Sequence, residues 1–527
     1  MKKILRYAAA LTAAAMFSGC VDIQPRREES AAPETSDAEQ TTHAEYEEVP
    51  PQEYPEDETP VKLKLNAEGG VTDANIRTDG EFDGTGYIVL DEGMTLTHIA
   101  DVPAAQHYSV ALAVHSYGGA VVSLNMHNER AGVYYVPASE STDYSLIVVD
   151  NLYMANGPMI MNFTCESGSA ALDYIIVENS DKVPREYYRT AESPVSSNST
   201  VAAIGTMKYL SNSYGKNVIT GQNVTPGTNA ELEAIYTETG RYPAMRCGEI
   251  ALLTLDGEDD KERMAEELRL AADWGGKGGI VSCTWHWYSP TGSRGVNAVA
   301  FDLAAALSGQ DTEGTALMGA EELDTLLENG YISEGLRALA ADIDKAAEFL
   351  KTLADEDIPV IWQPLPEADA GLYWWGNDAD SFKKLWQFMF ARLCTYHSLK
   401  NLIWVWNGSS AEYYPGDRVC DIVGQSFFEN SSASFAGRFS ALARVSDTET
   451  KALAITACDK LPDPDYMLRD NAMWLWFAIG SGDYIINSDG TLSERHTDWQ
   501  SLHDAFNSEI CVTLDELPDL REYAFSS

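Results

Sequence analysis

Short apolar segments alternate with helical patterns through the last three-fifths of this 527-residue chain. The apolar segments have the length of buried strands and span residues 217–223, 242–250, 278–290, 358–368, 401–408, 421–429, 451–459 and 483–490. Helical stretches lie between them, for example residues 260–275, 334–354 and 378–398. Eight strand–helix units over roughly 310 residues predict an α/β fold, a (β/α)8 TIM barrel, over residues 201–520. Residues 291–335 form an insertion after the third strand.

Residues 61–180 follow a different pattern. Runs of β-branched and aromatic residues are separated there by short breaks of Gly, Asn, Asp and Ser. Regular spacing of this kind predicts an N-terminal all-β sandwich domain. Residues 181–200 are then a linker to the barrel.

The first twenty residues carry three basic residues and then an apolar stretch that ends at Cys20. This layout is typical of a secretory signal peptide and is too short to span a membrane. Small residues directly before a cysteine resemble the bacterial lipobox, which implies cleavage before Cys20 and a diacylglycerol on its thiol. We therefore expect a lipid anchor on the extracellular face of the bacterial membrane; a plain signal peptide with a chance cysteine is the alternative. The acidic, proline-containing residues 21–60 are expected to form a disordered linker.

The formal net charge of −45 argues against nucleic acid as a partner, because phosphate contacts need clustered Lys and Arg. Seven cysteines follow Cys20, and none is spaced as C-x-x-C. An odd number without that spacing indicates neither a complete disulfide framework nor a zinc site. We therefore expect free thiols.

Aromatic and carboxamide side chains cluster at the ends of the expected barrel strands, where (β/α)8 enzymes carry their chemistry. Flat aromatic faces can stack on sugar rings, while polar edges hydrogen-bond to sugar hydroxyls. The expected substrate-binding residues are Trp285, His286, Trp287, Trp374, Trp375, Trp406 and Phe428. Their grouping favours a carbohydrate cleft over tryptophans that only fill the barrel core.

Five segments together resemble glycoside hydrolase family 26, namely residues 278–290, 364–376, 401–408, 413–424 and 461–477. The resemblance implies action on β-mannan or a related plant hemicellulose, because members are mostly endo-β-1,4-mannanases. It also implies a retaining mechanism. A glutamate after the fourth strand acts as general acid/base, and a second glutamate after the seventh strand is the nucleophile. Such a double displacement needs two carboxyl groups roughly 5–5.5 Å apart.

Residue by residue, the chain departs from that pattern. The acid/base is present as Glu367, but Ala457 stands at the nucleophile position. Phe428 replaces the tyrosine whose hydroxyl normally bonds the nucleophile. Further departures are Gln363 for Arg, Pro366 for His, Ser426 for Asp, and Glu249 near a usual Asp. Together these changes predict that glycan binding is kept and that covalent chemistry is lost.

Short motifs at both ends of the β-rich region resemble carbohydrate-binding module families 6 and 35. These modules hold a structural calcium near the two ends of the chain. Carried over, Glu68 and Asp173 are the expected calcium ligands, and carboxylate oxygens suit that cation. The alternative is that both are surface acids of an unrelated sandwich.

A second hypothesis keeps hydrolysis through a replacement carboxylate. Asp459 lies two residues after Ala457, so on a regular strand it faces the same side, and Glu429 is the other candidate. An inverting mechanism tolerates about 6.5–9.5 Å between carboxyls, which admits Glu367 with Asp459. A scaffold or adhesion protein without a glycan role is the third hypothesis, and the aromatic residues argue against it. The barrel is expected to need no cofactor.

Overall fold

The computed structural model of the protein describes residues 59–526, apart from 128, 181–182, 293, 447 and 449. The expected signal peptide, Cys20 and the acidic linker up to residue 58 therefore lie outside the described residues. Within the described part of the chain, no helix combines the length and the apolar character needed to cross a bilayer.

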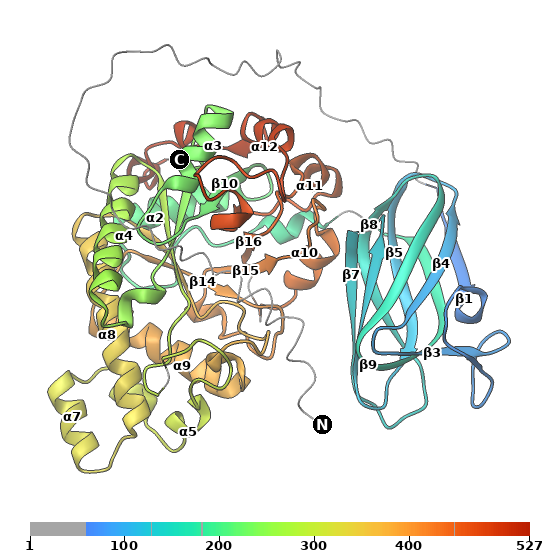
Figure 1. The fold of residues 1–527 in the computed structure, drawn as a ribbon, viewed down its shortest axis with the longest axis horizontal. Coiled ribbons are helices and arrows are strands. Elements are labelled where there is room, and N and C mark those ends of the chain that lie inside the picture. Colours follow the sequence, from blue (N-terminus) through green and yellow to red (C-terminus); the bar gives the residue numbers. More distant parts are fainter. Residues whose placement is uncertain are drawn as a thin grey trace.

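Residues 62–179 form an all-β region (Figure 1). Its antiparallel strands are β1 (Lys62–Asn66), β2 (Ile76–Arg77), β3 (Tyr87–Asp91), β4 (Thr95–Val102), β5 (Gln106–His115), β6 (Ala120–Met126), β7 (Glu129–Val136), β8 (Ser145–Met154) and β9 (Gly157–Asn179). The long β9 pairs with β1, β3 and β5 in one sheet and with β4 and β6 in the other. We call this unit the β-region.

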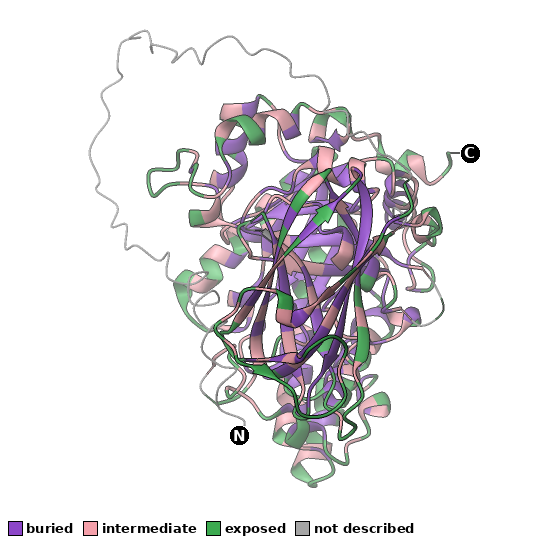
Figure 2. Ribbon diagram, turned by 90° about the vertical axis from the view of Figure 1, so that its right-hand side faces the viewer, coloured by how far each residue is buried: buried purple, intermediate pink, exposed green. Residues whose placement is uncertain are grey.

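Inward side chains of both sheets make one apolar cluster, separate from the core of the barrel. Figure 2 faces the β-region and shows buried residues along its strands and exposed residues in the connecting loops. A core enclosed by two antiparallel sheets is consistent with the expected sandwich.

The second unit is a closed barrel of eight parallel strands, which confirms the expected fold class. They are β10 (Val218–Asn223), β11 (Met245–Glu249), β12 (Ile280–Trp285), β13 (Val360–Pro364), β14 (Leu402–Asn407), β15 (Ile422–Phe427), β16 (Ala452–Cys458) and β17 (Trp476–Ile479). The barrel closes because β17 pairs in parallel with β10. One strand assignment is wrong: the eighth strand is β17, and the expected segment 483–490 begins within a 3-10 turn, Gly482–Tyr484.

The helices are α2 (Val201–Ser213), α3 (Ala230–Thr239), α4 (Glu258–Gly276), α5 (Leu303–Leu307), α6 (Thr312–Thr315), α7 (Ala320–Glu328), α8 (Glu334–Asp355), α9 (Ala379–Ala391), α10 (Ala436–Leu442), α11 (Pro464–Asp470), α12 (Trp499–Phe506) and α13 (Leu520–Tyr523). Helices α5 to α7 make up the expected insertion after β12. Between β14 and β15 the chain forms only a short 3-10 helix, Asp417–Val419, in place of a full α-helix.

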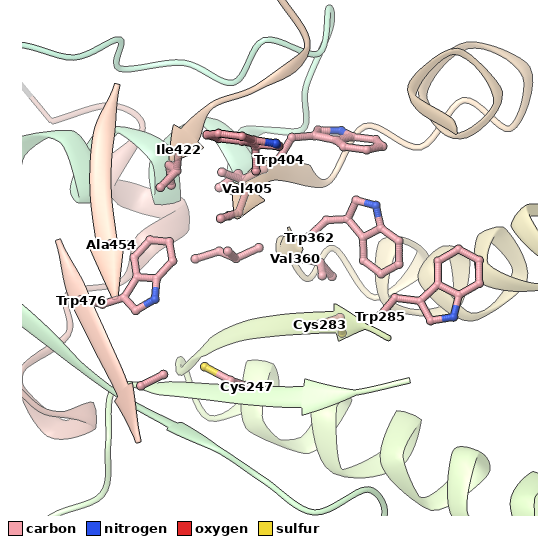
Figure 3. Packing of buried hydrophobic residues seen from close by; sticks show 14 of the residues in the cluster. Cys247, Cys283, Trp285, Val360, Trp362, Trp404, Val405, Ile422, Ala454 and Trp476 are labelled. Atoms are coloured by element: carbon pink, nitrogen blue, oxygen red, sulfur yellow. The ribbon is translucent and has the colours of Figure 1, made fainter. Parts of the chain in front are cut away.

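Aromatic and sulfur-containing side chains pack against the barrel strands (Figure 3), and Trp404 lies against Trp386 and Phe390 of α9. Trp362, Trp404 and Trp476 come from three different strands and are at most 2% exposed. Cys247 and Cys283 lie in the same core. All seven cysteines that follow Cys20 are buried free thiols, as predicted, and they act as small apolar side chains.

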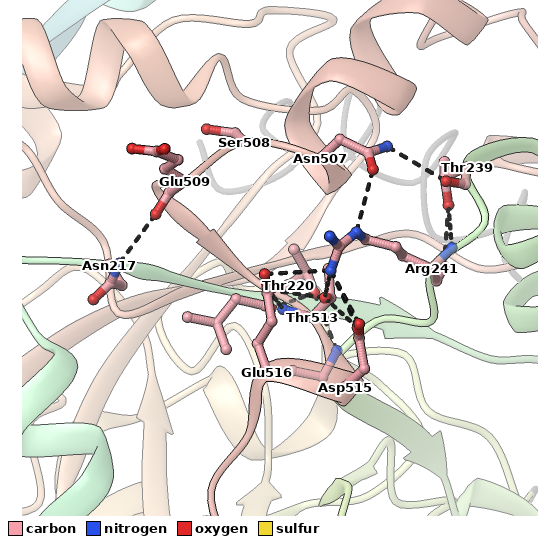
Figure 4. A network of polar contacts seen from close by, with 12 residues as sticks. Asn217, Thr220, Thr239, Arg241, Asn507, Ser508, Glu509, Thr513, Asp515 and Glu516 are labelled. Carbon is pink, nitrogen blue, oxygen red and sulfur yellow. Dashed lines mark hydrogen bonds and ion pairs between the residues drawn. The ribbon is translucent and has the colours of Figure 1, made fainter.

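A polar network closes the N-terminal end of the barrel (Figure 4). Arg241 precedes β11 and donates to Asn507 at 3.2 Å, to Thr513 at 3.2 Å and to Asp515 at 3.1 Å. These contacts tie the C-terminal segment, including β18 (Cys511–Val512), to the start of β10. The network lies at the end opposite the C-terminal strand ends, so we assign it to stability.

Candidate active site

Glu367 lies three residues after β13, at the C-terminal end of the barrel. Its backbone has a positive φ of 52°, and its N–H donates to Asn407 Oδ1 at 3.2 Å. Burial raises the pKa of the Glu367 carboxyl, although the charge of His286 and the Ser426 hydroxyl oppose that shift. A carboxyl with a raised pKa can keep its proton and donate it, as a general acid requires.

His286 forms the second polar group of the site. Its Nδ1 pairs with a Glu249 carboxylate oxygen, and its backbone N–H donates to the other at 3.2 Å. Burial alone would lower the pKa of His286, but the carboxylates of Glu249 and Glu367 outweigh it and raise that pKa. The structure therefore brings together the two predicted residues Glu367 and His286, with Glu249 as the group that orients the imidazole.

Ala457 lies at the end of β16, where the strand is irregular. The register with β15 shifts after Gln425, so that Ser426 stands opposite Ala457. The register with β17 also shifts between Ile455 and Cys458. One extra residue in a strand is a β-bulge, which re-aims the side chains that follow it. Asn407 fills the neighbouring space and donates to Thr456 Oγ1 at 2.6 Å and to Ser426 Oγ at 3.0 Å.

The two expected replacement carboxylates are both engaged elsewhere. Asp459 is 7% exposed, and its carboxylate accepts the Asn430 N–H at 2.9 and 3.2 Å. Burial raises the pKa of Asp459 against the opposing effect of that N–H. Glu429 pairs with Arg438 at 2.7 Å and with Arg130 of the β-region at 3.7 Å. Because of these ion pairs, Glu429 is held toward the β-region.

Tyr484 is a site residue that sequence reasoning missed. It follows β17, its ring lies 5.5 Å from that of Phe428, and it packs on Gly480, where an added Cβ would lie 2.6 Å from the ring. Strands β15 and β17 flank β16, so these two aromatic rings flank the end of the strand that carries Ala457. Burial and the charges of Asp459 and Glu367 raise the pKa of the Tyr484 phenol, which is therefore a neutral hydroxyl. The sequence pattern placed Tyr484 inside the expected strand 483–490, whereas it lies in the 3-10 turn that follows β17.

The five expected tryptophans are fully buried, at 0% exposure, which corrects the expectation of open stacking faces. They are Trp285, Trp287, Trp374, Trp375 and Trp406. Trp285 stacks on Trp287 at 4.2 Å, and Trp287 donates its indole N–H to Asp342 at 3.0 Å. Trp374 packs on both Trp287 and Trp375, and Trp406 packs on Tyr414 of the loop after β14, so these rings form the packed base of the site. His286 and Phe428 are partly exposed and can meet a ligand directly.

Glu68 and Asp173, the expected calcium ligands, lie close enough that the charge of Glu68 acts on Asp173. Glu68 Oε1 accepts the Thr85 N–H at 2.7 Å, while Oε2 is buried without a hydrogen-bond partner. Asp173 accepts the Asp83 N–H at 2.9 Å, and Lys64 pairs with the Asp83 carboxylate. In the described part of the chain, no three His, Cys, Asp or Glu side chains gather as a metal site. The unpartnered Glu68 oxygen fits a cation that backbone carbonyls would complete.

A (β/α)8 barrel with a half-buried glutamate, an imidazole–carboxylate pair and amide groups at its C-terminal end has the architecture of a glycoside hydrolase. The sequence profile of glycosyl hydrolase family 26 matches residues 195–496. The chain belongs to this family.

Relatives match across most of the chain. A mannan endo-1,4-beta-mannosidase of Thermothelomyces thermophilus is 26% identical over 460 residues, which cover 83% of this chain and 86% of the relative. Mannan endo-1,4-beta-mannosidase B of Piromyces sp is 24% identical over 459 residues, which cover 85% and 75% of the two chains.

Among solved structures, a Podospora anserina GH26-CBM35 beta-(1,4)-mannanase aligns with a TM-score of 0.56 at 24% identity. The alignment covers 87% of this chain and 99% of that protein. A ruminal GH26 endo-beta-1,4-mannanase aligns with a TM-score of 0.59 at 22% identity and covers 89% and 99%. At these identities the likeness shows a shared fold.

Proposed function

We propose that this protein binds β-mannan or a related hemicellulose at the C-terminal end of its barrel, with little or no hydrolysis. One observation carries the proposal: the barrel mouth has Glu367, but the end of β16 has Ala457 where a second carboxylate would be needed. Family membership and relatives described as mannan endo-1,4-beta-mannosidases support mannan as the ligand.

Retaining hydrolysis needs a second carboxylate facing the acid/base, because the sugar must be transferred to the protein before water arrives. Ser426 occupies the position opposite Ala457, and its hydroxyl lowers the pKa of the nearby Glu367 carboxyl. Hydroxyl, amide and imidazole groups remain, and these are donors and acceptors suited to neutral sugar hydroxyls. The site therefore keeps the means to bind a glycan and lacks the nucleophile.

Slow hydrolysis with Asp459 as a replacement carboxylate is the alternative. One observation favours it, since Asp459 and Glu367 both act on the phenol of Tyr484 and so lie on the same side of the barrel mouth. The hydrogen bond from Asn430 to Asp459 weighs against it, because an inverting base must be free to activate water.

Binding without turnover is the expected behaviour of the native chain. Purified protein should be retarded in gels that contain galactomannan or glucomannan and should release no reducing ends from either polysaccharide. We expect Tyr484→Phe to weaken binding about fivefold, the effect of one lost hydrogen bond of about 1 kcal/mol. Tyr331→Phe, at an exposed position in the insertion, is the matched control. If the native chain forms product and Glu367→Gln abolishes that product, the proposal is wrong.

We further propose that the β-region is a carbohydrate-binding module with one calcium held by Glu68 and Asp173. The buried, unpartnered Glu68 oxygen supports this proposal. Calcium at a hundredfold excess over its Kd should stabilise the folded chain by about 2.7 kcal/mol and so raise its thermal midpoint. EGTA should reverse this rise. Glu68→Gln should remove the response, while Glu81→Gln should keep it. An unchanged midpoint of the native chain in calcium and in EGTA would contradict calcium binding.

We propose that Cys20 carries the lipid that anchors the protein outside the bacterial cell. The basic residues, apolar stretch and small residues before Cys20 support this assignment. Cys20→Ala should move the protein from the membrane fraction of cells to the soluble fraction, because the single anchor is lost. An unchanged membrane fraction for that variant would rule the anchor out.

A further inference from the structure

The β-region contacts the barrel through polar pairs on its β7–β8 side, next to α10 and α11 (Figure 1). His107 Nε2 lies 3.0 Å from Asp470 Oδ1, and both side chains are at most 3% exposed. Helix α10 approaches so closely that a Cβ at Gly437 would lie 3.1 Å from Val149 of β8. The two units are therefore packed together.

One of these pairs ends on a loop of the barrel mouth, residues 428–434, which we call the mouth loop, and the His107–Asp470 pair reaches the same loop through Ser434. Arg130 of β7 pairs with Glu166 within the β-region and reaches Glu429 at 3.7 Å. Glu429 is 17% exposed and also pairs with Arg438, so it lies between two guanidinium groups. At this end, the β-region holds the residue next to Phe428.

The other end of the mouth loop is held through Asp470. Ser434 donates its hydroxyl to Asp470, the same carboxylate that His107 of the β-region contacts. The backbone oxygen of Ser434 also accepts the indole N–H of Trp474 at 2.8 Å. Both ends of the mouth loop thus depend on groups that touch the β-region.

The mouth loop in turn carries groups of the candidate site. Phe428 contacts Tyr484, and the Asn430 N–H holds the Asp459 carboxylate at 2.9 Å. Asn430 has a positive φ of 51°, a backbone geometry that surrounding contacts must maintain. Loops that are not held by tertiary contacts open easily, so these pairs set the position of Phe428 and Asn430.

We propose that Arg130 is a positioning residue of the glycan site, through which the β-region holds the mouth loop and with it Phe428 and Asn430. The inference rests on the proposed function for its effect on glycan binding. On this proposal the β-region has a structural role in the barrel site, and this role is separate from any glycan binding by the β-region itself.

Arg130→Ala in the full chain tests the proposal, and Arg444→Ala is its matched control. Arg444 also pairs with a carboxylate across the two units, Asp150 at 3.5 Å, and within the described part of the chain it makes no hydrogen bond or ion pair to the mouth loop. Hydrogen exchange of a peptide that covers residues 428–434 should speed up about fivefold in Arg130→Ala and stay native in Arg444→Ala. Affinity for galactomannan should fall by a similar factor in Arg130→Ala alone, and Arg130→Lys should restore part of both effects.

Native exchange in Arg130→Ala, or equal acceleration in Arg444→Ala, would overturn the proposal. The two readouts also separate it from the proposed function. If the native chain binds no glycan, the proposed function fails, while the exchange of the mouth loop still decides whether Arg130 holds it. The two alanine variants could also lower the thermal midpoint equally and leave hydrogen exchange of the mouth loop unchanged. Arg130 would then only hold the β-region against the barrel, and the proposal would be wrong.

Discussion

Mannan hydrolysis should appear when a carboxylate is installed at position 457. We expect the double substitution Ala457→Glu/Phe428→Tyr to release reducing ends from soluble galactomannan at a rate about 10²-fold above the assay background, at which the native chain should remain. The expected gain is below that of a complete retaining site, because Gln363 and Pro366 still replace the Arg and His that the family resemblance implies.

The physical reason lies in the geometry around Glu367. Ser426 stands opposite Ala457 on the neighbouring strand, and its hydroxyl lowers the pKa of Glu367, so position 457 and the acid/base face the same barrel mouth. A glutamate there can approach the roughly 5–5.5 Å separation that double displacement needs. Phe428→Tyr supplies the hydroxyl that the resemblance assigns to the nucleophile.

The matched control is Ala457→Gln/Phe428→Tyr, which has the same side-chain size and no nucleophile. Adding Glu367→Gln to the active double variant should abolish the gain, because the leaving oxygen then receives no proton. If the native chain hydrolyses mannan and Asp459→Asn removes that activity, the replacement-carboxylate mechanism is established instead.

The largest stability effect is expected at the buried pair of Arg246 and Glu267, between β11 and α4. The two guanidinium nitrogens of Arg246 donate to the two Glu267 oxygens at 2.6 and 2.8 Å, and both side chains are at most 1% exposed. Glu267 also accepts the Gly227 N–H at 2.9 Å, and Arg246 donates to Asn229 at 2.8 Å. The pair therefore joins α4 to the segment that leads into α3.

Glu267→Ala should lower the free energy of unfolding by about 3–5 kcal/mol, since it leaves the Arg246 charge buried without a counter-charge. The midpoint of urea denaturation, followed by tryptophan fluorescence, measures the loss. Glu266→Ala is the control on the same helix, because Glu266 pairs with Arg269 at the exposed surface and should leave the midpoint close to native. Equal midpoints for the two variants would contradict the assignment.

Most of the barrel could be predicted from periodicity, because seven of its strands are short apolar runs bounded by helices. The eighth strand could not. Trp476–Ile479 is only four residues long and fully buried, so it shows no alternation, while residues 483–490 contain β-branched residues that form a turn and a loop. Closure of the barrel selects β17, because it pairs in parallel with both β16 and β10.

The tryptophans show a second limit of prediction from sequence, which concerns side-chain exposure. Their grouping at strand ends was correct, yet a sequence pattern does not distinguish an indole that faces solvent from one covered by a loop. Trp374 and Trp375 donate their indole N–H groups to Trp287 and Pro366 backbone oxygens at 2.7 and 3.0 Å, inside the protein. Folding of the loops after β12 and β13 decided their burial.

Local pattern was therefore sufficient for the fold class, the free thiols and the position of Glu367, because each depends on neighbouring residues or on strand order. Contacts between distant segments decided the rest: the bulge beside Ala457, the engagement of Asp459 by Asn430, the place of Tyr484 and the reach of Arg130 to Glu429. These contacts join residues that lie tens to hundreds of positions apart. Only packing brings such groups together, because side-chain direction at a strand end depends on register and on what covers it.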